Sequence, residues 1–240
     1  MPLENEDRPS DSPYVHRVWR SRASGVARMT SVATSNWEIV FWEHAGRVNA
    51  AVRGPETTAS SVEVPDGLDS FGITFAHGAS MPHLPVARLV DSAMESPHAT
   101  ATTFVLLGDE WLIPDFDSAE QFVARLVREG AVVRDPLVYD VVVGGTADVG
   151  TRSVQRRVAA ATGLTQGSIR QIERARQAAI LLGEGLAPLE VVNRLGYYDQ
   201  PHLARSLARF IGRTATDLRR LDMAAQPLSL LYKTDGTTDS

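Results

Sequence analysis

Residues 187–212 read APLEVVNRLGYYDQPHLARSLARFIG, and this stretch decides the fold of the C-terminal part of the chain. Pro188 stands where a helix can start, and Gly196 ends that first helix. Asp199 is a good N-cap for a second helix that begins near Gln200. The apolar positions expected to face inward are Leu189, Val192 and Leu195 in the first helix and Leu203, Leu207 and Phe210 in the second. A short helix, a glycine turn and a second helix form a helix-turn-helix layout.

The outer face of the second helix is polar and cationic. His202, Arg205 and Arg209 are spaced i, i+3 and i+7, on the side opposite the apolar stripe. Such side chains can donate hydrogen bonds to base edges and phosphates in the DNA major groove. A face that only contacts solvent is the alternative interpretation, but the helix-turn-helix spacing favours DNA.

A helix upstream has a similar pattern. The segment TRSVQRRVAAA, residues 151–161, has apolar side chains at positions i, i+4 and i+7, which predicts one buried face. A second face carries Arg152, Gln155 and Arg156, whose side chains can read guanine and adenine edges. In an isolated helix this face would indicate no more than contact with solvent, so its interpretation depends on the neighbouring elements.

A long helix is expected between these two elements. Residues 166–182 show an apolar stripe at helical spacing, and Gly183 and Gly185 end the pattern. A helix of about 17 residues is roughly 25 Å long. Glu173 and Arg176 are three residues apart and can pair on its surface.

The N-terminal part alternates short β-rich runs with turn residues. One such run is WEIVFW, residues 37–42, and the pattern extends from about residue 14 to residue 76. It predicts an antiparallel sandwich or barrel. Residues 118–129 predict a helix that is followed by Gly130.

The expected fold class is therefore α+β, with a β-rich, cupin-like barrel or sandwich followed by an all-α double helix-turn-helix domain. The expected organisation is a disordered leader at 1–13, a β-rich sensory or dimerisation domain at 14–134, a DNA-binding domain at 135–223 and a polar tail at 224–240.

Composition separates the two halves of the chain by charge. The formal net charge is −5 overall. Residues 1–134 carry 11 Arg and 18 acidic side chains, whereas residues 135–223 carry 12 Arg and nine acidic side chains, a net charge of +3. This asymmetry indicates a part that binds nucleic acid. A bias in the coding DNA toward Arg is the alternative explanation.

Composition also excludes some classes of protein. The chain contains no cysteine, which excludes disulfides and thiolate metal sites. No apolar run approaches the roughly 20 residues that span a bilayer, and the acidic start of the chain lacks the apolar core of a secretory signal. We expect a cytoplasmic protein that has no membrane partner.

Residues 150–220 resemble the DNA-binding domain of the AraC/XylS family of transcription regulators. The resemblance rests on TRSVQRRVAAATGLT, on QIERARQAAILL and on VVNRLGYYDQPHLARSLARFIGRT. It implies two helix-turn-helix units joined by one long helix, each placing a recognition helix in a major groove of double-stranded DNA. It also implies a regulator without enzymatic activity, cofactor or metal.

The resemblance carries functional roles to particular residues. The base-reading residues are expected at Arg152, Gln155 and Arg156 in the first unit and at Gln200, Pro201, His202 and Arg205 in the second. Contacts to phosphate are expected from Thr151, Arg209 and Arg213.

The chain departs from the family pattern at three places. Gly150 replaces the usual Ser before the first recognition helix, which leaves Thr151 as a candidate cap, and Ala215 replaces a Pro after the second. Residues 135–150, DPLVYDVVVGGTADVG, are short and Gly-rich for the two helices that should precede the first recognition helix. A truncated first unit is therefore expected.

The N-terminal part resembles, less closely, the β-rich sensory domains of these regulators. The resemblance implies binding of a small effector or formation of a homodimer, and no motif decides between them. A cupin-like, metal-dependent enzyme is the alternative function. Its candidate ligands are His44, His77, His83 and His98, with Glu38, Glu43 or Asp109 as carboxylates. The absence of a His-x-His pair argues against it.

A protein-interaction module is a third interpretation. Trp19, Trp37, Trp42 and Trp111 could line an interface, although their strand positions favour the core or a pocket lining.

Overall fold

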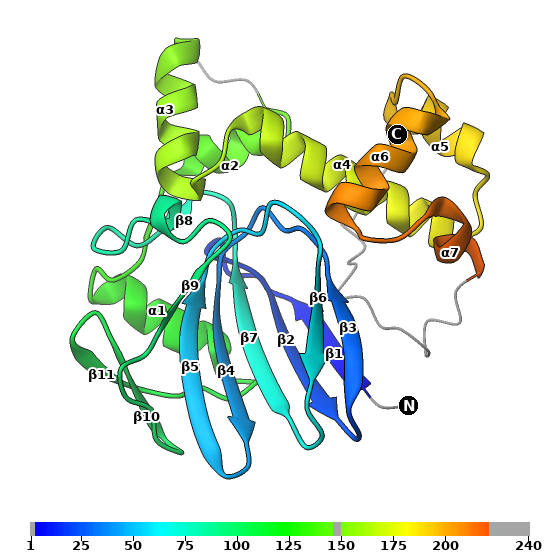
Figure 1. Ribbon diagram of the computed structural model, residues 1–240. Coiled ribbons are helices and arrows are strands. Elements are labelled where there is room, and N and C mark those ends of the chain that lie inside the picture. The colour runs from blue at the N-terminus through cyan, green and yellow to red at the C-terminus, as the bar shows by residue number, and fades with distance from the viewer. Residues whose placement is uncertain (1–2, 146–149, 221–240) are drawn as a thin grey trace.

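The computed structural model describes residues 3–145 and 150–220, which form a mixed α+β fold (Figure 1). Its largest element is a six-stranded sheet in the order β1-β2-β7-β4-β5-β9, with every pair antiparallel. These strands are β1 (Leu3–Pro9), β2 (Val15–Ala23), β4 (Glu38–His44), β5 (Arg47–Arg53), β7 (Asp69–Phe75) and β9 (Ala93–Glu95). Within the described residues β1 and β9 remain edge strands, so the sheet does not close into a barrel, which was one of the two expected forms.

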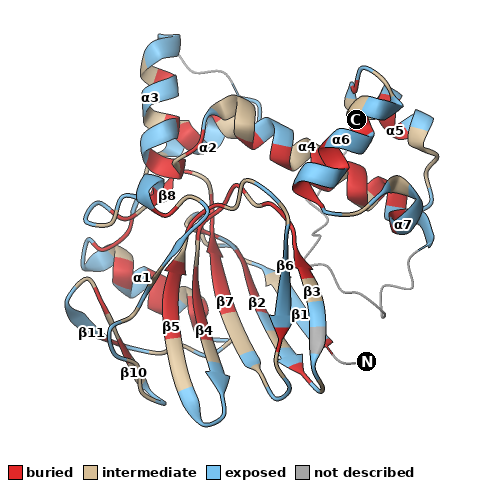
Figure 2. Ribbon diagram, viewed as in Figure 1, coloured by how far each residue is buried: buried red, intermediate tan, exposed pale blue. Residues whose placement is uncertain are grey.

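One face of the sheet forms the apolar core of the β-rich half. Alternate residues such as Ile39, Phe41 and Ile73 are buried there, as period-two alternation requires. They pack against α1 (Ala119–Arg128) and the hairpin of β10 (Thr103–Leu106) and β11 (Asp109–Leu112). Figure 2 shows buried residues on β4, β5 and β7, whereas α1 and the β10–β11 hairpin also carry exposed ones. Phe41 meets Phe104 of β10 edge-on, with ring centroids 5.0 Å apart.

The other face of the sheet carries a mixture of aromatic and charged side chains. The antiparallel pair of β3 (Ala27–Ser31) and β6 (Ser60–Val64), a separate two-stranded sheet, lies over this face (Figure 1). Trp19 of β2 lies directly on the sheet because Gly72 of β7 has no side chain. A Cβ on Gly72 would fall 2.3 Å from the indole ring.

The N-terminal segment is ordered from Leu3 to Pro9, so the expected disordered leader is wrong over these residues. β1 pairs with β2 along its whole length, from Leu3 opposite Ala23 to Pro9 opposite Arg17. Arg8 holds the strand to α1 by donating to both oxygens of Glu120, at 2.6 and 2.8 Å. These bonds lower the pKa of Glu120 to about 2. An edge strand needs only backbone pairing on one side, which polar side chains do not prevent. The expected tail at 224–240 lies outside the described residues.

The C-terminal half is helical and follows the expected boundaries closely. Its helices are α2 (Pro136–Val142), α3 (Thr151–Thr162), α4 (Gln166–Gly183), α5 (Pro188–Leu195), α6 (Gln200–Phe210) and α7 (Ala215–Arg220). Asp199 caps α6, as expected. The apolar stripe of α5 differs from the expectation: Leu189 is 57% exposed, and Val191 is buried beside Val192 instead.

The two halves contact each other along α4, which lies across one end of the sheet (Figure 1). Val32 and Ala33, which follow β3, belong to the apolar core of the helices. Two shorter elements complete this region: the strand pair β8 (Ala79–Ser80) and β12 (Val133–Arg134), and the 3-10 helix η1 (Val86–Arg88). None of the helices in the described ranges is long and apolar enough to cross a membrane.

Candidate nucleic-acid interface

The helix pair α5–α6, where the second helix-turn-helix is expected, is held by local bonds at its turn. Asp199 Oδ1 accepts from the backbone N–H of His202 at 2.7 Å, and Gly196 takes the left-handed conformation at φ 66°. Tyr197 is buried, and its hydroxyl lies 3.1 Å from Ser206 Oγ on α6. Arg174 of α4 stacks over the Tyr197 ring at 4.4 Å, so the unit is also held against the long helix.

The outer face of α6 gathers the expected DNA-reading residues. Gln200, Pro201, Arg205 and Arg209 are all exposed on this helix. His202 is half-buried: its Nδ1 accepts from the Tyr198 N–H at 3.3 Å, and its ring meets Tyr197 edge-on. His202 therefore supports the turn, and at most part of its ring can face a ligand. The expected phosphate contact Arg213 is half-buried, past the end of α6.

The first unit presents its expected residues at the start of α3. Thr151, Arg152, Gln155 and Arg156 are exposed. The N-cap is Gly150, which makes no side-chain capping bond, so Thr151 is not the cap.

The neighbouring Arg157 has a structural partner. Its Nε and Nη2 donate to the two carboxylate oxygens of Asp135, each at 2.6 Å. This fork ties α3 to the start of α2.

The helical segment that precedes α3 is short. Between Asp135 and Gly145 the structure has one helix, the seven-residue α2, which agrees with the expected truncation. The other end of α3 packs against η1: a Cβ on Gly163 would lie 2.8 Å from Ala87 Cα. The position of α3 therefore depends on the β-rich half as well as on α2.

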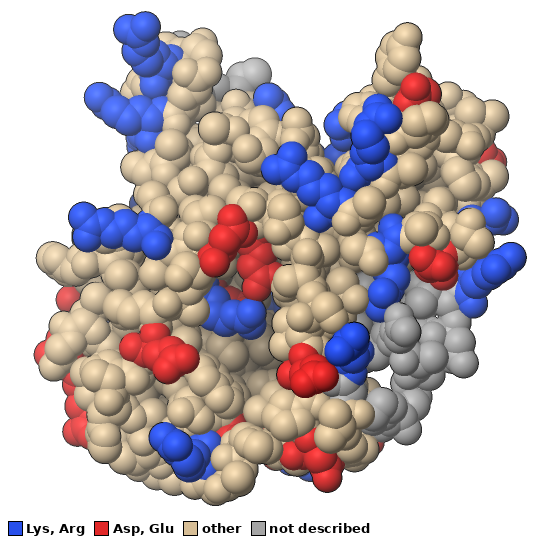
Figure 3. Space-filling view, viewed as in Figure 1, with Lys and Arg blue, Asp and Glu red and all other residues tan. Residues whose placement is uncertain are grey.

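The two candidate recognition helices lie at opposite ends of α4. Figure 1 shows α3 at one end and the α5–α6 pair at the other. Figure 3 shows arginine side chains gathered over both ends, which project from the molecule and are separated by a gap. Residues 150–220 carry 12 Arg against five acidic side chains. A cationic surface with two projecting ends suits a polyanion.

Sequence reasoning missed some exposed residues beside this surface. Tyr198 is 90% exposed immediately before α6, and Arg170 and Arg194 are exposed on α4 and α5. The helical period could have indicated Arg170, which lies one residue away from the buried Ile169. The pair Tyr197-Tyr198 gives no such signal, because only packing decides which ring is buried.

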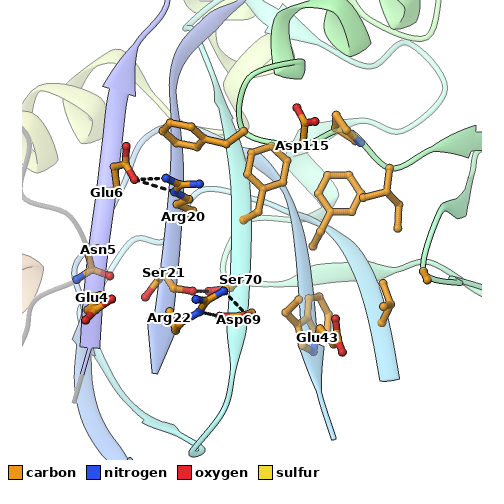
Figure 4. Close-up of a pocket in the computed structure, with 18 residues that line it drawn as sticks. Glu4, Asn5, Glu6, Arg20, Ser21, Arg22, Glu43, Asp69, Ser70 and Asp115 are labelled. Atoms are coloured by element: carbon orange, nitrogen blue, oxygen red, sulfur yellow. Dashed lines mark hydrogen bonds and ion pairs between the residues drawn. The ribbon is translucent and has the colours of Figure 1, made fainter. Parts of the chain in front are cut away.

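Two pockets lie on opposite faces of the large sheet. The wider one, about 800 Å³, is lined by charged side chains that pair with one another (Figure 4). Arg20 pairs with Glu6 at 2.5 Å and Arg22 with Asp69 at 2.7 Å. All four side chains are at least half exposed. Exposed, mutually neutralised pairs contribute little to binding. The second pocket, about 510 Å³, lies under the β3–β6 pair and includes Arg176 of α4.

The four tryptophans divide between the core and this second pocket. Trp37 is buried and stacks on Phe75 at 3.8 Å, and Trp111 is buried beside Phe122. Trp19 and Trp42 line the second pocket. These positions agree with the expectation of core and pocket lining.

The histidines proposed as metal ligands do not come together. In the ranges that the structure describes, no three His, Asp or Glu side chains are grouped so that they could hold a metal ion. His77 Nε2 lies 2.9 Å from Ser35 Oγ, which itself donates to Glu173 of α4. Burial lowers the pKa of His77. This chain of bonds connects the β-rich half to the long helix.

Comparison of the chain with protein-family models, with curated proteins and with solved structures gives no match.

Proposed function

We propose that this protein is a sequence-specific DNA-binding transcription regulator of the AraC type. The observation that carries the proposal is the pair of exposed, Arg-bearing helices α3 and α6 at the two ends of α4. Arg side chains on an exposed helix can hold guanine through two hydrogen bonds in the major groove. A protein with this role works in the compartment that contains the DNA.

The length of α4 suits two contacts on one face of a duplex. Its 18 residues span roughly 27 Å at the usual helical rise. Successive major grooves on one face of DNA are about 34 Å apart, a distance that α4 and its flanking turns can bridge. The binding site should contain two unlike elements about one turn apart, because the outer faces of α3 and α6 carry different residues.

We assign separate roles to the exposed side chains. Arg152, Gln155 and Arg156 read one element, and Gln200, Pro201, His202 and Arg205 read the other, with His202 limited by its place in the turn. Thr151, Arg209 and Arg213 contact phosphates, which position the protein without specifying sequence.

The β-rich half acts as a sensor in this proposal. The pocket under the β3–β6 pair has a volume within the range of small-molecule sites, and it includes a residue of α4. This favours an effector over dimerisation as the role of this half.

Selection of bound sequences from a random DNA pool, with the full-length protein, tests the proposal. We expect two enriched elements about one turn apart, with affinity that falls steeply as salt rises. Inserting about five base pairs between them should remove the contribution of the weaker element, because it is rotated by half a turn.

Arg47→Ala is the matched control, since Arg47 is exposed on the β4–β5 hairpin at the far end of the sheet (Figure 1). If no sequence is enriched, or if binding depends on Arg47 as much as on Arg205, the proposal is wrong.

A further inference from the structure

The first half of α4 has an outer face that is turned away from the β-rich half. Arg176 marks the inner side of the helix, because its Nη1 donates to the Ala33 carbonyl at 2.9 Å. Gln171 is five residues before Arg176 and lies about 140° around the helix from it, and Arg170 lies about 120° from it. Both side chains are exposed. Gln171 therefore points away from the β-rich half, and Arg170 points outward beside it.

The charges of α4 are divided between its two sides. Its one acidic residue, Glu173, accepts from Ser35 Oγ of the β-rich half. One of its three arginines is the buried residue of the inner side, and Arg174 stacks over the Tyr197 ring at 4.4 Å. Arg170 makes no hydrogen bond or ion pair with another residue of the described ranges. The outer face therefore carries a cation without a carboxylate partner on the same helix.

The candidate recognition helices have their far ends on this same side of α4. Both meet the β-rich half with their C-terminal ends: a Cβ on Gly163 would lie 2.8 Å from Ala87 Cα, and the Phe210 carbonyl accepts from the Ala33 N–H at 2.8 Å. Their N-terminal ends project away from the sheet, and α4 runs between them (Figure 1). Figure 3 shows the gap that separates the two projecting ends. The outer face of α4 lies at the base of this gap.

A duplex bound in the proposed way presents a minor groove to the outer face of α4. Successive major grooves on one face of DNA are about 34 Å apart, and the minor groove lies between them on the same face. The major groove is about 8.5 Å deep, so the backbones that flank the minor groove stand nearer to the protein than the base edges that α3 and α6 would read. The gap between the projecting ends gives these backbones room.

The two side chains on the outer face suit a minor groove of A·T pairs. Such pairs present only acceptors there, adenine N3 and thymine O2, whereas a G·C pair adds the amino donor of guanine N2. Arg170 can only donate hydrogen bonds, and Gln171 can donate through its amide nitrogen. A·T-rich tracts also have a narrow minor groove, whose negative potential attracts Arg.

We propose that Arg170 inserts into the minor groove between the two DNA elements, with Gln171 beside it, and that this contact selects A·T-rich sequence there. This inference rests on the proposed DNA-binding function and adds a third contact to it. α3 and α6 read the two elements through the major groove, whereas α4 reads the segment between them through its acceptors and its width. Specificity therefore extends to base pairs that neither recognition helix touches.

The first experiment measures the affinity of the full chain for duplexes that carry the two selected elements in phase and differ only at the centre. With about five central base pairs changed, an A·T centre should bind about fivefold more tightly than a G·C centre. A centre of inosine·cytosine pairs lacks the N2 amino group but keeps the major-groove pattern of G·C. It should bind as the A·T centre does, because the contact lies in the minor groove.

Variants of the full chain assign this preference to one side chain. Arg170→Ala should remove the preference for the A·T centre, and Arg170→Lys should keep only part of it, because an ammonium is more strongly hydrated than a guanidinium. Arg194→Ala is the matched control: it removes an exposed arginine from the neighbouring α5 and should leave the preference unchanged. Ala is a good helix former, so both truncated variants should fold.

The second experiment, methylation by dimethyl sulfate, separates this inference from the proposed function. The reagent methylates guanine N7 in the major groove and adenine N3 in the minor groove. Bound protein should protect guanine N7 within both elements, as the proposed function requires, and adenine N3 at the centre, as the inference requires. Arg170→Ala should restore methylation at the central adenine N3 and leave the N7 protection in place.

The outcomes that contradict the two proposals differ. Guanine N7 protection together with equal affinity for the A·T and G·C centres would overturn the minor-groove contact and leave the proposed function. Weak binding of the inosine centre, or loss of the preference in Arg194→Ala, would overturn the contact as well. If guanine N7 is protected in neither element, the proposed function fails and the minor-groove contact fails with it.

Discussion

The two proposed helix-turn-helix units differ in how they hold their candidate recognition helices. α6 is held by its own unit and by α4: an αL glycine at Gly196, the Asp199 cap and the Tyr197–Ser206 contact. α3 packs on the seven-residue α2 and on α4, starts without a side-chain cap and has an end that packs on η1. A recognition helix can thus be positioned by a local motif or by a distant part of the chain.

This difference bears on how each unit can be regulated. A unit positioned by its own turn should read DNA in a similar way whatever the β-rich half does. A unit positioned by η1 should change its DNA affinity when the β-rich half changes conformation. Both helices contact the β-rich half at their C-terminal ends, but only α3 depends on that contact for most of its support.

The largest effect is expected at the glycine that ends α3. Gly163→Ala places a Cβ 2.6 Å from Val90 Cγ2 at φ 73°. A left-handed residue costs about 1–2 kcal/mol and overpacking about 1–3 kcal/mol, so the free energy of unfolding should fall by about 2–5 kcal/mol.

Urea unfolding of the full chain measures this change. Gly196→Ala is the matched control, because a Cβ there meets nothing within 4 Å at φ 66°. The free energy of unfolding of the control should fall only by the conformational cost of about 1–2 kcal/mol. Equal losses in the two variants would show that η1 does not brace α3.

The next effect is expected on DNA binding by the second unit. Arg205→Ala should cost about 1–3 kcal/mol, or about 5- to 150-fold, on the selected site and relax preference at one base position. Competition binding against a panel of single-base variants measures both. Arg213→Ala should weaken binding to all sequences alike, so identical profiles for the two variants would contradict the assignment.

A smaller effect is expected in the first unit. Arg156→Ala should cost about 1 kcal/mol or less, the lower end of the range for a base contact, because α3 is less firmly held. The same competition assay measures it on the site with the two elements in phase. A loss of DNA affinity larger than that of Arg205→Ala would show that the first unit contributes more to binding than the second.

The smallest effect is expected at the fork between α3 and α2. Asp135→Asn keeps a side chain that can cap α2 but removes the charge that faces Arg157. This partly exposed pair is screened by salt, so overall stability should hardly change and only the first element should lose affinity, chiefly at low salt. Asp69→Asn breaks a similar fork with Arg22 far from the helices and should leave DNA binding unchanged. An equal change in DNA affinity in both variants would show that the Asp135–Arg157 pair has no specific role in positioning α3.

Local signals were enough to predict the C-terminal helices from the sequence. Each such signal affects only the backbone within a few residues of it. The signals are Asp199 before a helical apolar stripe, Pro188 in a first turn and Gly196 at a left-handed position. Such signals do not depend on the rest of the fold, so the boundaries of α3, α4 and α6 and the exposure of Arg152, Arg156 and Arg205 could be predicted.

The order of the N-terminal strand and the pairing of charges needed the tertiary structure. The polar sequence of β1 does not indicate that it pairs with β2 at the edge of the sheet. It also does not indicate that Arg8 bonds to Glu120 of α1. Period-two alternation predicts that Arg17 and Trp19 share one face of a strand, but it says nothing of what lies opposite. Arg17 and Arg176 of α4 line one pocket because of how an open sheet, the β3–β6 pair and a long helix pack, and such neighbourhoods of distant segments leave no local pattern in the chain.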